Sequence, residues 1–207
     1  VERSRGLGDV YKRQKLLFLL PPEQSQNISH FFLKLFSGLY KSKQTHLFVK
    51  GLRVKNRLGL AAGLDKNARL INEFDNIGFG FVEVGTITPK AQYGNPKPRI
   101  KRLISHESLL NSLGFPNEGV RSIKSRLKKV SGDICLGVNI GPNKDTVPEE
   151  VINDYLLCYE EVFEYADFVT INISSPNTPN LRSLHNAENF KAVIDAILSE
   201  RNRHQKK

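Results

Sequence analysis

The stretch LGLAAGLDKNARLINEFDNIGFGFVEVGT, residues 58–86, decides the fold. It opens with a short apolar run at 58–62 and closes with another at 81–85. Between the two runs, apolar residues recur at the spacing of one helix face: Leu70, Ile71, Phe74 and Ile77. A strand, a helix and a second strand in this order predict two parallel strands joined by a right-handed crossover.

The same unit recurs further along the chain. Apolar runs at 134–140 and 168–173 are typical of buried strands. Helix-spaced segments lie at 120–127, before the first of these runs, and at 151–163 and 190–197, after the first and the second run. Residues 86–117 form a long insertion between the second strand and its helix, and loops of that length are usually functional. The pattern predicts an α/β fold with four parallel strands.

Two architectures have this pattern, a doubly wound sheet and a barrel of eight strand–helix units. Polar residues follow every predicted strand: Asp65 with Lys66, Thr86, Asn139 and Asn172. In a barrel all strand ends open on the active-site face, whereas a doubly wound sheet has one switch point. We therefore predict an incomplete (β/α)8 TIM barrel of about four βα units, with half of the barrel absent.

The N-terminal region predicts a helical hairpin. A short apolar turn at 15–20 ends at Pro21 and Pro22, and an amphipathic helix is expected at 25–41, with Ser25 or Asn27 as its N-cap. The apolar face could pack on a core, or it could meet lipid or an apolar ligand. Periodicity alone leaves both open. Residues 1–14 show no period and are expected to be a non-native leader, 15–45 the hairpin, and 46–207 the N-terminal half of the barrel.

Composition narrows the class of protein. Lys and Arg number 31 against 21 Asp and Glu, a formal charge of +10, which suits anionic lipid, anionic substrates or nucleic acid. No basic helix with interleaved aromatic residues is present, so nucleic-acid binding is not expected. No apolar run approaches the roughly 18 residues of a spanning helix. Cys135 and Cys158 lie in apolar segments as packed, reduced thiols, and no spacing suggests a metal site.

Residues at the strand ends suggest a binding site. Ala61, Ala62 and Gly63 are small enough for a flat ring to approach the backbone, and Lys66 places a cation beside them. Four amides lie in nearby loops or strand ends: Asn111, Asn139, Asn172 and Asn177. One such Asn would more often form a turn, but four beside a lysine favour recognition of a pyrimidine edge, since amides both donate and accept.

Five segments, in order, resemble the dihydroorotate dehydrogenase family. They are GLAAGLDKN (59–67), EVGTITPKAQYGNPKPRI (83–100), SLLNSLGFPNEG (108–119), GVNIGPNKDT (137–146) and TINISSPNTPNLRSL (170–184). The resemblance covers residues 51–184, and the hairpin resembles that of the membrane-associated class 2 enzymes. It implies oxidation of (S)-dihydroorotate to orotate in de novo pyrimidine (UMP) synthesis, with FMN as hydride acceptor and a quinone, ubiquinone or menaquinone, as final electron acceptor.

The resemblance also implies roles for residues. Ser175 is the expected base that removes the C5 proton of dihydroorotate, and Thr178 is a candidate proton relay. This position is cysteine in the soluble classes, so serine here favours the membrane-associated class. The resemblance assigns substrate binding to Lys66, Asn111, Ser112, Leu113, Gly114, Phe115, Asn172 and Asn177. It assigns flavin binding to Ala61, Ala62, Gly63, Leu64, Asp65, Lys66, Thr86, Asn139 and Asn172.

The family's barrel continues for about as many strands again, and its flavin phosphate sits on loops after the last strands. The chain is therefore expected to be an N-terminal fragment that is inactive alone and does not bind FMN tightly. The expected location is peripheral, on the cytoplasmic face of a bacterial inner membrane or on a mitochondrial inner membrane. Two alternatives stay open, a related soluble flavin dehydrogenase using fumarate or NAD, and a non-catalytic peripheral membrane module.

Overall fold

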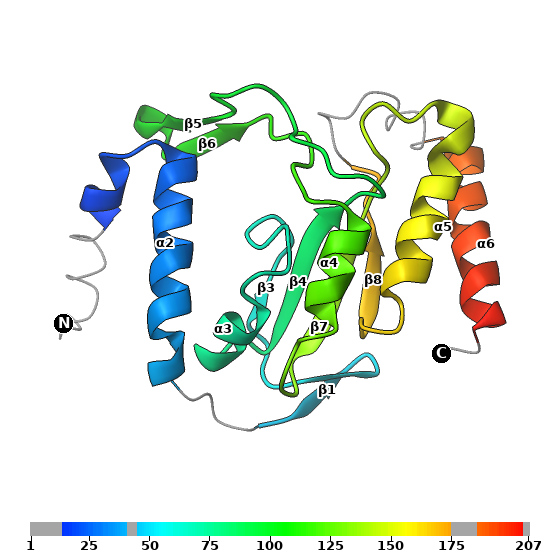
Figure 1. Cartoon of the computed structure of the whole chain (residues 1–207), viewed down its shortest axis with the longest axis horizontal. Coiled ribbons are helices and arrows are strands. Elements are labelled where there is room, and N and C mark those ends of the chain that lie inside the picture. The colour runs from blue at the N-terminus through cyan, green and yellow to red at the C-terminus, as the bar shows by residue number, and fades with distance from the viewer. Residues whose placement is uncertain (1–13, 41–44, 175–185, 205–207) are drawn as a thin grey trace.

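A four-stranded parallel sheet forms the centre of the computed structural model, which describes residues 14–40, 45–174 and 186–204 (Figure 1). Its strands are β3 (Gly59–Leu60), β4 (Phe81–Ile87), β7 (Cys135–Ile140) and β8 (Phe168–Ile171), in that spatial order. The strand order equals the chain order, so the sheet grows in one direction as a barrel does. A doubly wound sheet would reverse its order at a switch point. The predicted partial barrel is confirmed.

A helix follows each strand of the sheet. They are α3 (Ile71–Asn76), α4 (Val120–Leu127), α5 (Val151–Val162) and α6 (Ala187–Arg203), with a 3-10 turn η3 (Pro148–Glu150) leading into α5. The core lies between these helices and one face of the sheet. It includes fully buried residues of both layers, among them Val84, Val138, Ile123, Tyr155 and Val193.

The opposite face of the sheet lines the inside of the partial barrel. In β4, Val82 and Val84 are buried against the helices, whereas Phe81 and Glu83 alternate with them and are only half-buried. Side chains on a strand point alternately to its two faces, so Glu83 points inward. At the start of the strands a Cβ on Gly59 would lie 2.0 Å from the ring of Phe81. Glycine therefore leaves room there for a large inward-facing ring.

The N-terminal hairpin region is helical at residues 14–18 and in α2 (Pro22–Phe36), followed by the 3-10 turn η1 (Ser37–Leu39). The predicted N-caps are wrong. The helix begins at Pro22, with Pro21 as N-cap and no side-chain cap, because proline has the helical φ and no N–H to satisfy. Ser25 lies inside the helix, where its hydroxyl donates to the carbonyl oxygen of Leu17 at 2.7 Å.

Two antiparallel hairpins were not predicted. One is β1 (Leu47–Val49) with β2 (Leu52–Val54), and the other lies in the insertion, where β5 (Ile100–Leu103) and β6 (Ser108–Asn111) flank the 3-10 turn η2 (Ile104–His106). Every residue of β6 is exposed, so its side chains lack the alternation by which a half-buried strand is recognised. In the described part of the chain, no helix combines the length and apolar character that membrane crossing requires.

Candidate active site

A cavity of about 480 Å³ opens at the carboxyl ends of the parallel strands, where the insertion folds back toward the sheet. Its lining combines strand ends with the segment after β6: Ala61, Ala62, Gly63, Lys66, Glu83, Gly85, Thr86, Asn111, Leu113, Gly114, Phe115, Pro116, Asn139, Thr170, Asn172 and Ser174. Parallel strands bring their carboxyl ends to one edge, so residues from distant parts of the sequence meet there.

Hydrogen-bonded polar side chains from three strands form one wall. The Thr86 hydroxyl donates to Oδ1 of Asn139 at 2.7 Å. The Asn172 amide donates to the Thr86 hydroxyl at 2.9 Å and to the same Asn139 oxygen at 3.1 Å. The Asn139 amide in turn donates to Oε1 of Glu83 at 2.9 Å. Each partner fixes the rotamer of the next, so the wall presents donors and acceptors in set directions.

The floor of the cavity is small and consists largely of backbone. Ala61, Ala62 and Gly63 come from the loop after β3, and Gly85 ends the regular pairing of β4. The Gly63 N–H donates to the Gly85 carbonyl at 2.9 Å, which ties the two segments together. Gly85 has a φ of 111°, and a Cβ there would lie 2.4 Å from the Asn139 carbonyl oxygen. Only glycine fits this position, and a flat group can approach the floor closely.

Lys66 brings a positive charge to the cavity edge. Its ammonium donates to the Gly63 carbonyl oxygen, and within the described residues no carboxylate forms an ion pair with it. Burial lowers the pKa of Lys66, and the charge of Arg99 lowers it further, while Glu23 and Asp65 raise it. A half-buried ammonium without a carboxylate partner is suited to an anionic ligand.

The insertion supplies the remaining wall. Phe115 adopts a φ of 49°, and its carbonyl and that of Gly114 each accept a hydrogen bond from the Gln92 amide at 3.1 Å. Asn117 then donates to the Thr88 hydroxyl at 2.8 Å, which fastens the end of the insertion to the strand that it leaves. The ring of Phe115 is thereby held beside the strand ends rather than in solvent.

Residues 45–206 match the family model for dihydroorotate dehydrogenase. The chain belongs to the dihydroorotate dehydrogenase family. It is 47% identical over 201 residues to a dihydroorotate dehydrogenase (quinone) of Marinomonas sp., matching 93% of this chain and 58% of that protein. A protein of the same name from Pseudomonas syringae is 45% identical over 89% of this chain and 56% of its own length.

A crystal structure of Eimeria tenella DHODH in complex with ferulenol superposes with a TM-score of 0.77 and 38% identity, over 88% of this chain and 51% of that one. A ligand-free DHODH structure from the same organism has a TM-score of 0.75 at 39% identity. The chain thus spans about half the length of its dihydroorotate dehydrogenase relatives.

Most of the site residues that the sequence predicts line this cavity. Three do not line it. Leu64 is exposed and its carbonyl accepts from Gln26, Ser112 is exposed, and the carboxylate of Asp65 accepts from the backbone N–H groups of Arg69 and Leu70 at 2.8 and 2.7 Å. The expected base Ser175, with Asn177 and Thr178, lies outside the described residues.

Sequence reasoning missed five lining residues, Glu83, Gly85, Pro116, Thr170 and Ser174. Glu83 carried a usable signal, since a carboxylate alternates there with Val82 and Val84 and must point to the other face of the strand. Thr170 lies opposite Asn139 in the pairing of β8 with β7, so it becomes visible only once the register is known.

A second, larger cavity of about 1050 Å³ lies between the N-terminal helices and the β5–β6 hairpin. Its lining is largely apolar and includes Phe18, Leu33, Phe74, Leu103 and Leu109. α2 holds one side and the insertion the other, so the cavity exists only because two regions that are distant in the sequence pack together (Figure 1).

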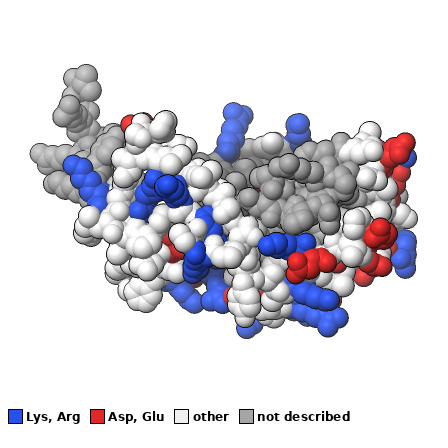
Figure 2. All heavy atoms as spheres, turned by 90° about the horizontal axis from the view of Figure 1, so that it is seen from above, with Lys and Arg blue, Asp and Glu red and all other residues white. Residues whose placement is uncertain are grey.

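Charge is unevenly distributed over the end of the sheet toward which β4 points. Figure 2 looks down on that end and shows Lys and Arg side chains over the N-terminal helices and the centre, while Asp and Glu gather at the side of α5 and α6.

Proposed function

We propose that this chain contributes substrate and flavin contacts to the oxidation of (S)-dihydroorotate to orotate, with FMN as hydride acceptor and a quinone as final electron acceptor, in de novo pyrimidine synthesis. The supporting observation is the cavity at the strand ends. There a wall of amide and hydroxyl groups surrounds a floor of alanine and glycine, and the Lys66 ammonium has no carboxylate partner among the described residues.

The cavity suits dihydroorotate, a pyrimidine ring that carries a carboxylate. Ring carbonyl and N–H groups need acceptors and donors side by side, and Asn111, Asn172 and the backbone of residues 113–115 offer both. Lys66 offers the charge that a carboxylate needs. On the resemblance alone, we assign removal of the C5 proton of dihydroorotate to the Ser175 hydroxyl, with Thr178 as the proton relay.

The residues present also fit FMN. The floor at Ala61, Ala62 and Gly63 has no side chain larger than a methyl group, and a Cβ on Gly63 would meet nothing within 4 Å. Thr86 and Asn139, each only 7% exposed, place polar atoms beside that floor. FMN supplies hydride acceptance when it is bound. The task of these residues is to hold a flat ring against the substrate, because orientation provides much of the rate when a carbon acid is oxidised.

We propose that the electron acceptor enters the apolar cavity from a membrane surface. The outer side of α2 and η1 exposes Phe31, Phe32, Leu35, Phe36 and Leu39, which are 46–79% exposed. A contiguous apolar face of this kind is suited to the interface between lipid headgroups and acyl chains. We place the protein peripherally on the inner membrane of a bacterium or mitochondrion, with the cavity mouth toward the lipid.

A chimaera tests the activity. Residues 15–203 of this chain would replace the matching part of the Marinomonas protein, and dihydroorotate oxidation would be followed at 37 °C or below with a ubiquinone analogue, fumarate or NAD as acceptor. We expect activity with the quinone alone, and a loss of at least about a hundredfold in Ser175→Ala, as for removal of a general base. Activity with fumarate or NAD, or an unaffected Ser175→Ala variant, contradicts the proposal.

A further inference from the structure

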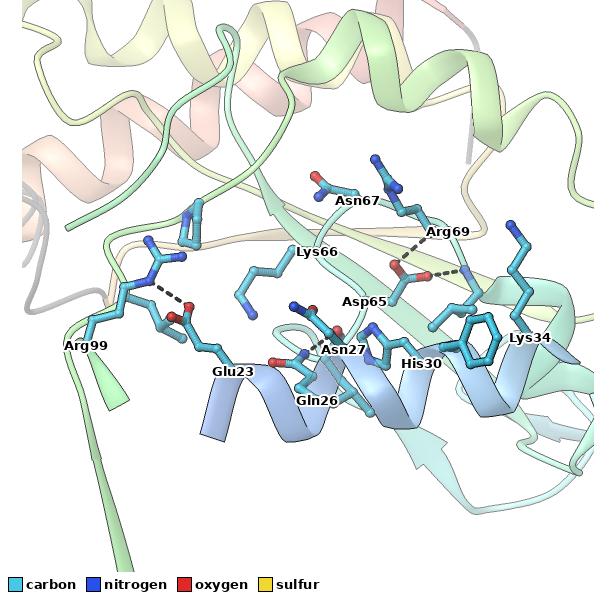
Figure 3. A pocket seen from close by; sticks show the side chains of 15 residues that line it. Glu23, Gln26, Asn27, His30, Lys34, Asp65, Lys66, Asn67, Arg69 and Arg99 are labelled. Carbon is cyan, nitrogen blue, oxygen red and sulfur yellow. Dashed lines mark hydrogen bonds and ion pairs between the residues drawn. The ribbon is translucent and has the colours of Figure 1, made fainter. Parts of the chain in front are cut away.

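The loop after β3, residues 61–70, faces the end of the insertion across open space. Lys66 from the loop and Leu113 and Pro116 from the insertion line the cavity at the strand ends, and they also line a polar cavity of about 460 Å³ beside α2. Figure 3 shows the polar cavity, with Lys66 and Asn67 on the loop. Because cavities rather than packed side chains separate the two segments, their spacing depends on the polar contacts that join them.

Three contacts join the loop to the insertion and to α4, the helix that follows it. The Glu118 N–H donates to Oδ1 of Asn67 at 3.0 Å. The Arg126 guanidinium on α4 donates to the Asn67 carbonyl oxygen at 2.8 Å, and the Arg69 guanidinium donates to the Glu118 carboxylate. Among the described residues, no other hydrogen bond links the loop to residues 111–127.

The Glu118 carboxylate is the centre of this junction. One of its oxygens accepts from Arg69 on the loop, and the other accepts from Arg126 on α4. Burial raises the pKa of Glu118, but the hydrogen bonds from the two guanidinium groups outweigh burial and lower the pKa. The carboxylate is therefore ionised at neutral pH, and two charge-assisted hydrogen bonds hold the loop and the helix to one residue of the insertion.

The turn that the junction holds has an unusual backbone. Ala68 has a φ of 54°, a left-handed conformation that residues with a Cβ rarely adopt. The Asp65 carboxylate closes this turn from within, since it accepts from the Arg69 N–H at 2.8 Å. The junction holds the residues on both sides of Ala68, namely Asn67 by its carbonyl oxygen and Arg69 by its side chain. It thereby sets where the turn lies relative to the insertion, and Lys66 moves with the turn.

On the insertion side, the junction lies next to the cavity wall. Asn117 precedes Glu118, and its amide donates to the Phe115 carbonyl oxygen at 2.9 Å and to the Thr88 hydroxyl at 2.8 Å. A shift of Glu118 is therefore transmitted to the wall that contains Phe115. The same side chain thus controls both sides of the space between that wall and Lys66.

We infer that Glu118 is a positioning residue, which holds the Lys66 ammonium at the distance from the insertion wall that a ring-bound carboxylate requires. Glu118 lines neither of the two cavities, so it acts through Lys66. Small displacements matter here, because the rate of an oriented reaction falls steeply when the substrate is misplaced. The inference rests on the proposed function and deepens it, since it adds the residue that sets recognition of the substrate carboxylate.

Charge alone predicts the opposite effect of removing this carboxylate. Glu118→Gln takes away a negative charge near Lys66, and by itself this makes the cavity more attractive to an anion. Positioning predicts weaker anion binding, because the NH₂ group of an amide cannot accept a hydrogen bond from the second guanidinium group. The sign of the change in affinity therefore separates the two effects.

Titration of the isotope-labelled chain with orotate, followed by NMR, measures this affinity even where binding is weak. For Glu118→Gln we expect about tenfold weaker orotate binding, the size of one lost charge-assisted hydrogen bond. Arg126→Lys keeps the charge but lacks the planar fork that reaches both Asn67 and Glu118, so it should weaken binding in the same way. Glu161→Gln is the matched control, since it removes the same charge from a pair with Lys124 on α4, and it should leave the affinity within about twofold.

A double-mutant cycle with Lys66 separates positioning from a general structural role. In Lys66→Met the group that Glu118 positions is gone, so the addition of Glu118→Gln should change orotate affinity by less than about twofold. A general weakening of the fold would lower the affinity by the same factor in both backgrounds.

Three results would overturn the inference. They are tighter or unchanged orotate binding in Glu118→Gln or in Arg126→Lys, an equal loss in Glu161→Gln, and an equal loss in the Lys66→Met background. Each leaves the proposed function standing if the unaltered chain binds orotate. If the unaltered chain binds no orotate, the inference and the substrate part of the proposed function fail together.

Discussion

Lys55 and Asp75 form an ion pair inside the molecule, with side chains only 3% and 12% exposed. The pair links β2's end to α3, since the ammonium of Lys55 donates directly to Asp75 Oδ1. Moving two charges out of water is costly, and their mutual attraction offsets the cost only while both are present. The pair is therefore far more sensitive to the loss of one partner than an exposed pair would be.

Asp75→Asn should lower the free energy of unfolding by about 3–5 kcal/mol, because it leaves the Lys55 charge buried without compensation. Urea denaturation followed by circular dichroism measures this. Asp195→Asn is the matched control, since Asp195 pairs with Lys191 on an exposed helix surface, where such a pair contributes only about 0.3–0.5 kcal/mol. Equal losses in the two variants would show that the buried site tolerates a free charge.

The thiols give a second prediction at the residue scale. Burial raises the pKa of Cys135 from 9.0 to about 11, and the charge of Asp167 contributes in the same direction. The folded chain holds this proton more tightly than the unfolded chain, so the contribution to stability is present below pH 9 and is lost as the pH rises toward 11. Between these pH values the unaltered chain should lose more unfolding free energy than Cys135→Val, as urea titrations at each pH would show. Parallel losses would contradict the raised pKa.

At the scale of elements, the N-terminal helices are held by two arginines of the insertion. Arg102 donates to the carbonyl oxygen of Leu20 at 2.7 Å and to the Ser25 hydroxyl at 3.2 Å, and its guanidinium lies 4.6 Å from the ring centre of Phe18. Arg99 donates to Glu23 at 2.8 Å. These contacts satisfy carbonyl groups at the end of the first helical segment and fix α2 beside β5.

Arg102→Ala should loosen the hairpin without unfolding the barrel strands. Loss of these hydrogen bonds should speed amide hydrogen exchange at residues 14–20 by about tenfold or more, since each is worth about 1 kcal/mol and those from charged donors more. Mass spectrometry of exchanged peptides measures this, with β4 and β7 as internal references. Lys101→Ala, at the neighbouring exposed position of β5, should leave exchange unchanged. Faster exchange throughout the chain would mean that Arg102 supports the whole fold.

At the scale of the whole molecule, four strands and their helices form an arc whose inner face carries the candidate site. Helices cover the outer face of the sheet, where Val82, Val138 and Ile140 have no exposed surface. The inner face carries the polar wall and the small floor of the cavity instead of a packed core. Within the described residues Lys66 is the only cation that lines the cavity.

The isolated chain should therefore bind flavin weakly and without regard to its phosphate. The dissociation constants of FMN and riboflavin should lie within about threefold of one another. A dedicated phosphate contact is a charge-assisted hydrogen bond, and it would make the difference larger than about threefold. Flavin fluorescence titration measures both. Ala62→Leu, which fills the floor, should abolish both. A preference of tenfold or more for FMN would show that the chain does hold a phosphate anchor.

The sequence by itself determined the strand–helix units, the inner placement of Thr86, Asn139 and Asn172, and the amphipathic character of α2. These follow from local periods, because burial on one face repeats every second residue in a strand and about every 3.6 residues in a helix. It also indicated the family, since its ordered motifs lie at successive strand ends.

Only the tertiary structure decided the rest. Asp65 accepts hydrogen bonds from backbone amides, Glu83 joins the polar wall, and the insertion folds into a hairpin. Among the described residues, Nε2 of His30 is left without a hydrogen-bond partner. Each outcome depends on which distant segment lies opposite, and that is fixed by the packing of α2, the insertion and the sheet. Local residue patterns carry no information about such partners, because the contacts that choose them are made only when the chain has folded.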